Sequence, residues 1–461
     1  MMLLSEAASA LNARLIGADV TFTSVGADSR NITPGQLFVA LKGENFDGHS
    51  FAEQAIQQGA AAVLLEDETV DVAPALLVPD SYQALGELAA YWRSKFTLPL
   101  AAITGSNGKT TVKEMLAAIL RAATNNADQV LATAGNLNNH IGLPLTLLKL
   151  RMQHRYAVVE MGMNHTGEIS YLSKIGKPTV ALINNAGSAH VGELGSFAAI
   201  AHAKGEIFDG LAADGIAVIN IDDVFAPLWQ TLAGERNTIT FGLKNKADVS
   251  ASYQLQASAS LLDMTTPQGA VSVHLPTPGL HNVLNALAAT SAALAMGVSL
   301  ADIATGLENY AGVKGRLQAL AGLHGSLVID DTYNANPMSM KAAIDVLVAK
   351  PGKKILVLGD MGELGASAAE SHAEIGAYAQ VAGVDALLTL GDLSERMTQA
   401  FNAEKGVRAK HYLTVAALTT DLIKQMQADT TVLVKGSRFM AMEHVVNEIT
   451  HKADHKNGER H

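Results

Sequence analysis

The chain has 461 residues, of which 48% are hydrophobic, and its 33 basic and 44 acidic side chains give a formal net charge of −11. This length suggests two or three domains, and the acidic balance argues against nucleic-acid binding as the main activity. The chain contains no cysteine, which excludes disulfides, thiolate metal sites and cysteine nucleophiles.

The first predicted element is an amphipathic helix at the N-terminus. A secretory signal is a poorer interpretation, because no basic stretch comes first and Glu6 interrupts the apolar run. Residues 282–301 form a long uncharged window, but they are rich in Ala, Ser and Thr and contain Gly297. This composition favours a buried helix over a membrane span, and we expect a cytoplasmic protein.

Short apolar strands alternate with helical stretches along the chain. Residues 1 to about 80 form a small α/β unit, and the next helix follows Pro79, with Asp80 or Ser81 as its N-cap. Continuous apolar runs between helices predict parallel sheets covered on both faces. These runs are 98–104, 156–162, 179–187 and 215–223 in the middle of the chain, and 326–337, 353–365, 385–392 and 431–438 after it. We therefore expect an α/β protein of three domains: 1–82, 83–312 and 313–461.

The segment AAITGSNGKTT, residues 101–111, is a strand followed by a glycine turn and the start of a helix. The usual phosphate-loop spacing, G-x-x-x-x-G-K-[ST], would need a glycine at position 103, where the chain has Ile103. Gly105 and Gly108 nevertheless allow backbone N–H groups to converge at a helix N-terminus, which favours anions. The segment therefore predicts a nucleotide site with a shortened loop.

Three side chains at this helix start suit a nucleotide. Lys109 can reach the outer phosphates, Thr110 can offer its hydroxyl to Mg²⁺, and Thr111 adds a second hydroxyl. The alternative is a plain connection between a strand and a helix, with a solvated lysine and Thr110 as an N-cap.

Glu160 and His190 follow the ends of neighbouring predicted strands, where open parallel sheets bind ligands. Glu160 closes an apolar run, so its carboxylate needs a partner or a metal there; otherwise it is a surface residue at a strand end. His190 is either a loop histidine or a ligand. Because Mg²⁺ prefers oxygen, His190 suits a more specialised second metal site.

At these residues the chain resembles the Mur ligases, the ATP-dependent amide-forming enzymes of peptidoglycan synthesis. Their phosphate loop has the short form TGSNGKTT found at residues 104–111. Further matching segments cover essentially the whole chain. They are GNLNNHIGLPLTLL (135–148), EMGMNHTGEI (160–169), AHVGELGS (189–196), AKGEIF (203–208), PGLHNVLNALAA (278–289), GRLQ (315–318), DDTYNANP (330–337) and KGSR (435–438).

Within the family, DDTYNANP and VLGDMGELG (357–365), with no D-N-P-R motif, indicate a ligase that joins D-Ala-D-Ala to UDP-MurNAc-tripeptide. The resemblance implies that ATP phosphorylates the tripeptide carboxylate and that the dipeptide amine attacks the acyl phosphate. It also implies a uridine-nucleotide domain, a central P-loop ATPase-like domain and a C-terminal Rossmann-like domain. The alternatives are a related ligase that adds another amino acid, a nucleotide-dependent switch and a catalytically silent relative. We expect a monomer.

The resemblance assigns roles to individual residues. Lys109, Glu160, His190 and Lys204 would be catalytic. Thr110, Glu160, His190 and Lys204 would hold two Mg²⁺ ions, with Lys204 either carbamylated or an ordinary helix-surface lysine. The nucleotide would contact Gly105, Ser106, Asn107, Gly108, Lys109, Thr110, Thr111, Asn136, Asn282, Arg316, Asp331, Tyr333 and Asn336.

Two further groups of residues are assigned to the other substrates. Arg30 suits a diphosphate because its donors form a fork, although it could equally be in a surface salt bridge. The uridine substrate would contact Ser29, Arg30, Asp47, Gly48 and His49, and the dipeptide carboxylate would contact Ser437 and Arg438. Asn285 lies one helical turn after Asn282, where it serves either the nucleotide or a helix contact. Asp331 and its neighbour could also be two solvated carboxylates.

Overall fold

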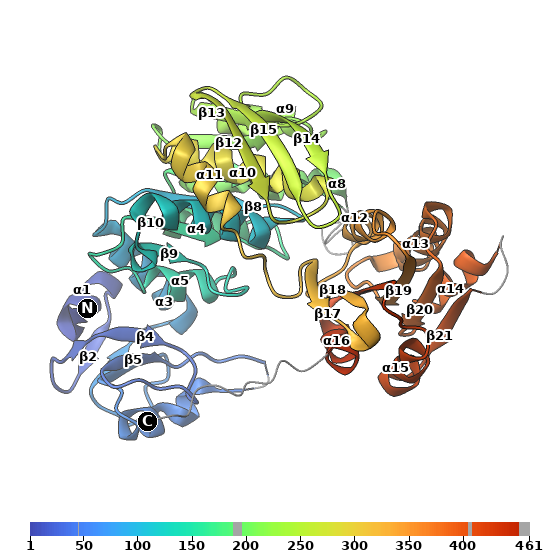
Figure 1. Ribbon diagram of the computed structural model, residues 1–461. Helices are drawn as coiled ribbons and strands as arrows, with labels where there is room; N and C mark the ends of the chain where they lie inside the picture. Colours follow the sequence, from blue (N-terminus) through green and yellow to red (C-terminus); the bar gives the residue numbers. More distant parts are fainter. Residues whose placement is uncertain (45, 188–195, 404–407, 451–461) are drawn as a thin grey trace, which may run out of the picture.

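The computed structural model describes residues 1–44, 46–187, 196–403 and 408–450. The chain folds into three parts in sequence order, each built on its own main sheet. Figure 1 shows the N-terminal part (blue) and the C-terminal part (orange to red) on opposite sides of the central part. The predicted α/β fold with three domains is confirmed, while the exact boundaries stay a prediction.

The N-terminal part has a five-stranded sheet in the order β2-β7-β6-β5-β4, in which only β2 is antiparallel to its neighbour. The predicted N-terminal helix is present as α1, which buries Leu4, Ala7 and Leu11. The elements are β1 (Met2–Leu3), α1 (Leu4–Leu11), β2 (Arg14–Ile16), β3 (Thr21–Phe22), β4 (Ser24–Gly26), β5 (Gln36–Val39), η1 (Gly48–Phe51), α2 (Ala52–Gln57), β6 (Ala62–Leu65) and β7 (Ala75–Leu77).

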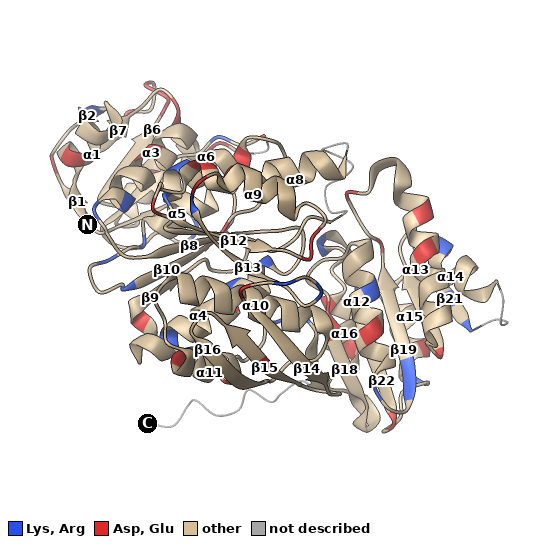
Figure 2. Cartoon of the chain, turned by 90° about the horizontal axis from the view of Figure 1, so that it is seen from above, with Lys and Arg blue, Asp and Glu red and all other residues tan. Residues whose placement is uncertain are grey.

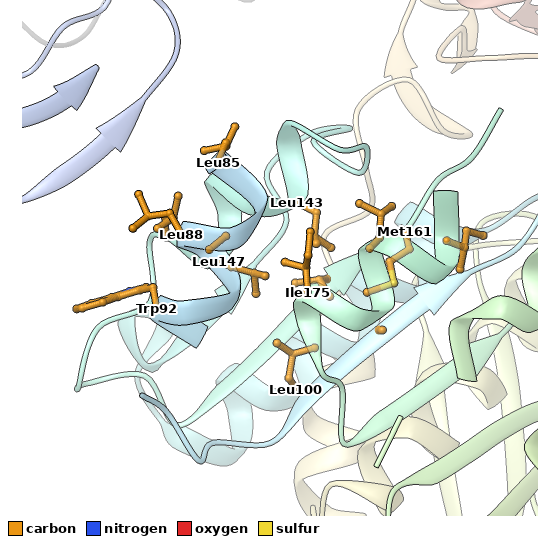
Figure 3. Packing of buried hydrophobic residues seen from close by; sticks show 14 of the residues in the cluster. Leu85, Leu88, Trp92, Leu100, Leu143, Leu147, Met161 and Ile175 are labelled. Atoms are coloured by element: carbon orange, nitrogen blue, oxygen red, sulfur yellow. The ribbon is translucent and has the colours of Figure 1, made fainter. Parts of the chain in front are cut away.

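Helix α3 (Ser81–Ser94) joins the N-terminal and central parts. The Asp80 carboxylate accepts the N–H of Gln83 at 2.9 Å, which confirms the predicted N-cap. The apolar face of α3 packs on α5 (Gly142–Leu147) and α6 (Glu168–Gly176). Figure 3 shows Leu85, Leu88 and Trp92 of α3 beside the side chains of those two helices. The boundary that we predicted at residue 82 lies in the first turn of this helix.

The central part has a six-stranded parallel sheet in the order β13-β12-β11-β8-β10-β9, with helices on both faces. Helices α4, α10 and α11 cover one face, and α3, α5, α6, α8 and α9 cover the other. The strands are β8 (Leu100–Thr104), β9 (Val130–Ala132), β10 (Tyr156–Glu160), β11 (Val180–Ile183), β12 (Ile216–Asn220) and β13 (Asn237–Phe241). The remaining helices are α4 (Lys109–Thr124), η2 (Ala127–Gln129), α8 (Phe197–Gly205), η3 (Glu206–Gly210), α9 (Ala226–Ala233), α10 (Leu280–Ala295) and α11 (Leu300–Glu308).

Three antiparallel strands, which the sequence analysis did not predict, pack on α10 and α11. They are β14 (Ser250–Leu255), β15 (Ser260–Thr266) and β16 (Gly269–Leu275). In β15, Ser260, Leu262, Met264 and Thr266 are buried, while the residues between them face solvent. This alternation is the ordinary signature of a sheet with one wet face.

The C-terminal part has a six-stranded sheet in the order β17-β18-β22-β19-β20-β21, in which only β17 is antiparallel. Helices α12, α13 and α14 cover one face and α15 and α16 the other, so the predicted doubly wound unit is confirmed. The strands are β17 (Gln318–Ala321), β18 (Leu327–Asp331), β19 (Lys353–Gly359), β20 (Ala386–Leu390), β21 (Ala409–Tyr412) and β22 (Thr430–Lys435). The helices are η4 (Leu323–Gly325), α12 (Pro337–Val348), η5 (Gly365–Ser367), α13 (Ala368–Ala382), α14 (Glu395–Asn402), α15 (Val415–Ile423), η6 (Arg438–Met440) and α16 (Glu443–Ile449).

Most of the long uncharged window lies in α10, whose Ala and Leu side chains are buried between the central sheet and β14–β16, and its last two residues begin α11. Among the described residues, no helix is both long and apolar enough to cross a membrane. Figure 2 shows Lys and Arg interspersed with Asp and Glu over the described elements.

Candidate active site

The glycine-rich loop lies between β8 and α4, at the carboxyl end of the central sheet. Gly108 has φ +80°, and a Cβ there would lie 2.4 Å from Asn285 Oδ1 and 2.5 Å from Asn184 Nδ2. Glycine is therefore required at position 108, both for the backbone conformation and for this close approach. The strand, turn and helix that a phosphate loop needs are all present.

Asparagines from neighbouring elements hold the tip of this short loop. The Asn185 side chain accepts the N–H of Asn107 at 2.9 Å and donates to its carbonyl at 3.1 Å. The Asn184 amide donates to the same carbonyl and to Asn285 Oδ1, both at 3.0 Å. Asn184 and Asn185 directly follow the buried strand β11 but were not predicted as site residues. Their side chains brace the loop from the next strand.

Two lysines lie at this site, Lys109 half-buried and Lys204 fully buried. Lys109 donates to the Gly105 carbonyl at 2.6 Å, and burial lowers its pKa, while the Glu160 carboxylate acts in the opposite direction. Lys204, on α8, is 2% exposed, which contradicts the interpretation of a helix-surface lysine. Burial, with the Lys109 charge adding to it, holds the pKa of Lys204 well below its ordinary value. Both ammonium groups would be stabilised by a bound anion.

Glu160 is 2% exposed, so its interpretation as a surface residue is wrong. Its carboxylate accepts the Thr110 hydroxyl at 3.0 Å on one oxygen and the Asn138 amide at 2.8 Å on the other. The structure thus brings Thr110 and Glu160 together, as the sequence analysis predicted, and adds Asn138. His190 lies outside the described residues.

The Thr110 hydroxyl and the Glu160 carboxylate are a pair of oxygen donors beside the phosphate loop. Such a pair fits Mg²⁺, which takes one or two protein oxygens and completes its shell with water and substrate phosphates. In the described part of the chain, no three His, Asp or Glu side chains gather as a metal-holding group. The described protein ligands therefore suit an ion that is shared with a phosphate ligand.

The C-terminal part reaches the phosphate loop through two residues. The Arg316 guanidinium donates to the Thr110 hydroxyl at 3.0 Å and lies 4.2 Å from the centroid of the Tyr333 ring. Asn336, the N-cap of α12, donates from its amide to Asn107 Oδ1 at 2.8 Å. Arg316 Nε and Asn107 Nδ2 are buried without a hydrogen-bond partner among the described atoms. Such donors indicate a site for a polar ligand.

Asp331 and Lys435 form an ion pair of 2.6 Å at the paired ends of β18 and β22. Asp331 also accepts the N–H of Leu317 at 3.1 Å, and Lys435 donates to the Asn334 carbonyl at 2.8 Å. Asp330 and Asp331 are both buried, so the alternative of two solvated carboxylates is wrong. Lys435 is therefore the partner of Asp331, which was not predicted from the sequence.

A cavity of about 910 Å³ lies between the central and C-terminal parts. This volume is in the range of small-molecule sites. Several residues that the resemblance assigned to the nucleotide line it: Ser106, Asn107, Gly108, Lys109, Thr111, Asn136, Asn282, Arg316, Asp331, Tyr333 and Asn336. Asn285, Glu160 and Lys204 line the same space. The structure therefore brings together residues that are far apart in the sequence.

The residues assigned to the uridine substrate lie in the N-terminal part, and they are not among the described residues that line this cavity. Arg30 is exposed and pairs with Asp28 at 2.8 Å, and this pairing lowers the pKa of Asp28. His49 is buried, with its ring bonded to Asp47 at 2.6 Å and accepting the Glu66 N–H at 3.1 Å. His49 therefore has a structural role in bracing its turn.

The residues assigned to the dipeptide differ in their surroundings. The Ser437 hydroxyl is buried, accepts the N–H of Gly362 at 2.8 Å and contacts the Ala335 carbonyl at 3.2 Å. The Arg438 side chain is 65% exposed and pairs with Glu443 at 2.7 Å. Ser437 thus joins two loops, and only Arg438 is openly accessible.

A short phosphate loop with two lysines, a carboxylate beside its threonine and an arginine from another domain defines a nucleotide-dependent enzyme of the P-loop class. Three family models match the chain: "Mur ligase family, catalytic domain" at residues 21–93, "Mur ligase middle domain" at 103–293 and "Mur ligase, glutamate ligase domain" at 315–438. The chain belongs to the Mur ligase family, and its class is that of ATP-dependent amide-forming ligases.

Curated relatives and solved structures agree with this assignment. The chain is 44% identical over 451 residues to the UDP-N-acetylmuramoyl-tripeptide–D-alanyl-D-alanine ligase of Escherichia coli, covering 97% of this chain and 98% of the relative. It is 39% identical to the enzyme of that name from Bacillus subtilis, covering 92% of each chain. A crystal structure of MurF from Acinetobacter baumannii has a TM-score of 0.89 and 39% identity, covering 96% of this chain and 97% of that one. The MurF ligase of Thermotoga maritima in complex with ADP has a TM-score of 0.80 and 30% identity, with coverage of 92% and 96%.

Proposed function

We propose that this chain joins D-alanyl-D-alanine to UDP-N-acetylmuramoyl-tripeptide at the expense of ATP, in the synthesis of the peptidoglycan precursor. Relatives named for this activity, similar over nearly the whole chain, are the observation that carries the proposal. The phosphate loop, Lys109 and Glu160 in one cavity support the ATP-dependent step. We propose that the reaction takes place in the cytoplasm and that the protein is a monomer.

The reaction has two chemical steps. The terminal carboxylate of the tripeptide attacks the γ-phosphorus of ATP, which forms an acyl phosphate and releases ADP. The amine of the dipeptide then attacks the acyl carbon, and phosphate leaves as the amide forms. Both steps depend on positioning and on neutralising negative charge.

Residues of the loop and of the C-terminal part would supply that neutralisation. The backbone of Gly105–Thr111 would cradle the β and γ phosphates, with Lys109 offsetting their charge. Arg316, which donates to the Thr110 hydroxyl, would reach the γ-phosphate from the C-terminal part. Asp331 and Tyr333 would contact the ribose and close over the nucleotide, while Asn136 and Asn282 would contact it from the central part.

Thr110 and Glu160 would hold one Mg²⁺, and His190 and Lys204 would contribute to a second. Bound there, the ions would neutralise phosphate oxygens and align them for transfer. The 3.0 Å contact between the Thr110 hydroxyl and the Glu160 carboxylate supports the first site.

We propose that Lys204 is carbamylated. Its burial favours the neutral amine, which is the form whose nitrogen attacks the carbon of CO₂; a C–N bond forms, the amine loses a proton, and a carbamate anion results. Enzyme prepared in ¹³C-bicarbonate should show a carbamate carbon signal that is lost in Lys204→Met. A spectrum without that signal would leave Lys204 as an unmodified amine.

The dipeptide carboxylate would bind at the C-terminal part near Ser437 and Arg438, and the uridine nucleotide would bind at the N-terminal part. The exposed Arg438 supports the first assignment and the exposed Arg30 the second. Arg438→Ala should raise the KM for the dipeptide more than the KM for ATP. An unchanged KM for the dipeptide would remove Arg438 from that site.

The experiment that tests the function measures phosphate release from ATP and Mg²⁺ with UDP-MurNAc-tripeptide, with and without D-Ala-D-Ala. Release that requires both substrates, with a product heavier by one dipeptide less water, is the expected result. Release supported by a single amino acid instead would mean a different amine acceptor. ATPase activity that ignores every acceptor would favour a nucleotide switch, and no release at all would favour a silent relative.

A further inference from the structure

Lys113, on α4, is a completely buried lysine that the proposed reaction does not use. Its side chain is 0% exposed and lies among the apolar residues of a helix that faces the central sheet. A buried ammonium is strongly disfavoured unless it is paired and hydrogen-bonded. The Lys113 ammonium therefore needs a hydrogen-bond partner, and Lys113 can in turn hold that partner in place.

The Lys113 ammonium has two partners. It pairs with the carboxylate of its neighbour Glu114 at 2.8 Å, and it donates to the carbonyl of Thr133 at 2.6 Å. Thr133 directly follows β9 and is 1% exposed. Lys113 thus joins the phosphate-loop helix to the end of a strand that is two positions away from β8 in the sheet.

Thr133 leads from this contact to the carboxylate beside the phosphate loop. Its own N–H donates to Val158, and its hydroxyl accepts the backbone N–H of Glu160 at 3.0 Å. The loop that begins after Thr133 also carries Asn138, whose amide donates to Glu160 Oε1 at 2.8 Å. Two of the hydrogen bonds that orient Glu160 therefore come from the segment that Lys113 holds.

We propose that Lys113 is a positioning residue for Glu160. By fixing the Thr133 carbonyl, it sets the Thr133 hydroxyl and the start of the following loop, and these orient the carboxylate toward Thr110. This inference rests on the proposed function, in which Thr110 and Glu160 hold Mg²⁺. Outer partners of metal ligands typically change metal affinity by about 10- to 100-fold when they are removed.

The test measures ADP binding to the full chain by calorimetry, first with EDTA and then at increasing Mg²⁺ concentrations. In Lys113→Met, ADP affinity with EDTA should stay unchanged, because the loop and Lys109 are intact. The Mg²⁺ concentration at which half of the Mg²⁺-dependent increase in ADP affinity is reached should rise by about 10- to 100-fold. Lys113→Arg, which keeps a cation and its donors, should recover part of this loss.

Thr133→Val gives an independent arm, since it removes the hydroxyl that accepts the Glu160 N–H and keeps the Thr133 carbonyl. Thr133→Val should shift the Mg²⁺ dependence of ADP binding in the same direction as Lys113→Met. If Lys113→Met does not fold, Thr133→Val alone tests whether this segment positions Glu160. The matched control is Arg93→Met. Arg93 is also buried and donates to a backbone carbonyl, that of Gly176 at 3.1 Å, but it lies before the opposite, amino end of β8. It should leave the Mg²⁺ dependence unchanged.

An unchanged Mg²⁺ dependence in Thr133→Val and in folded Lys113→Met would overturn the inference. An equal shift in Arg93→Met would also overturn it, because loss of general stability would then explain the effect. If the affinity of the wild type for ADP does not change with Mg²⁺ concentration, both this inference and the proposed Mg²⁺-binding roles of Thr110 and Glu160 are wrong. Amide formation by the wild type is measured separately and reports on the proposed function alone.

Discussion

The Arg316 guanidinium and the Thr110 hydroxyl, which are 206 positions apart in the chain, are joined by a hydrogen bond of 3.0 Å. The bond links the C-terminal part to the first turn of α4. The same hydroxyl donates to Glu160, and in the proposed reaction its oxygen would turn to a cation. In that reaction Arg316 would leave Thr110 and donate to the γ-phosphate.

Arg316 should therefore act on the chemical step more than on binding. We expect Arg316→Met to lower kcat by about 10²- to 10³-fold, as when one preorganised donor is removed from a transition state. Arg316→Lys should recover little, because lysine lacks the planar group that stacks on Tyr333. Steady-state kinetics with both substrates would check this. A change confined to the KM for ATP would contradict it.

Gly108 should tolerate no side chain. A non-glycine residue at φ +80° costs about 1–3 kcal/mol, and the new Cβ would also press on Asn285 and Asn184. We expect Gly108→Ala to weaken ADP binding by about tenfold or more, with the rest of the fold intact. Calorimetry with ADP and circular dichroism would measure the two effects. The matched control is Gly135→Ala, because Gly135 also has a positive φ, +55°, but a Cβ there would meet nothing within 4 Å. ADP binding equal to wild type in Gly108→Ala would contradict the steric argument.

The sequence allowed the parallel sheets, the phosphate loop and the position of Glu160 to be predicted, because each has a local pattern. Continuous apolar runs mark buried parallel strands, and a glycine turn before a helix marks the loop. The β14–β16 sheet was missed although Leu262 and Met264 alternate with exposed residues in β15. The sequence signal for that alternation is weak, because Ser260 is buried and Leu261 is exposed.

Other features could not be read from a local pattern. Lys113 counts as a polar residue in any helical periodicity, so its burial becomes visible only when Thr133 is placed beside it. The pairing of Asp331 with Lys435 depends on β18 and β22 being neighbours in the sheet. Such contacts are set by tertiary structure, and one sequence carries no local signal for them.

The pair of Asp331 and Lys435 should be important for stability as well as for the nucleotide. Their side chains are 12% and 4% exposed, and removing one partner of a buried pair typically costs about 3–5 kcal/mol. We therefore expect Asp331→Ala to lower the free energy of unfolding of the C-terminal part by an amount of this order. Adding Lys435→Met should restore part of it, because the unpaired ammonium is then absent. Urea unfolding of the two variants would measure this; a double variant less stable than Asp331→Ala would contradict it.

Lys204 should make the stability of the unmodified protein depend on pH. Burial holds the pKa of Lys204 below its value of 10.5 in an unfolded chain, so between the two values the unfolded state binds the extra proton. Stability therefore rises with pH across this window, is fully present above 10.5 and is lost as the pH falls through the folded pKa. Lys204→Met removes this pH-dependent contribution to the free energy of unfolding, whose slope is up to about 1.4 kcal/mol per pH unit.

In bicarbonate-free buffer, the unfolding free energy of Lys204→Met should exceed that of the wild type most at low pH, and the difference should shrink as the pH rises. Lys109 also has a lowered pKa, but it is present in both proteins and cancels to first order in the comparison. Parallel stability curves for the two proteins would show that the Lys204 amine stays protonated in the native state, and would remove the basis for its reaction with CO₂.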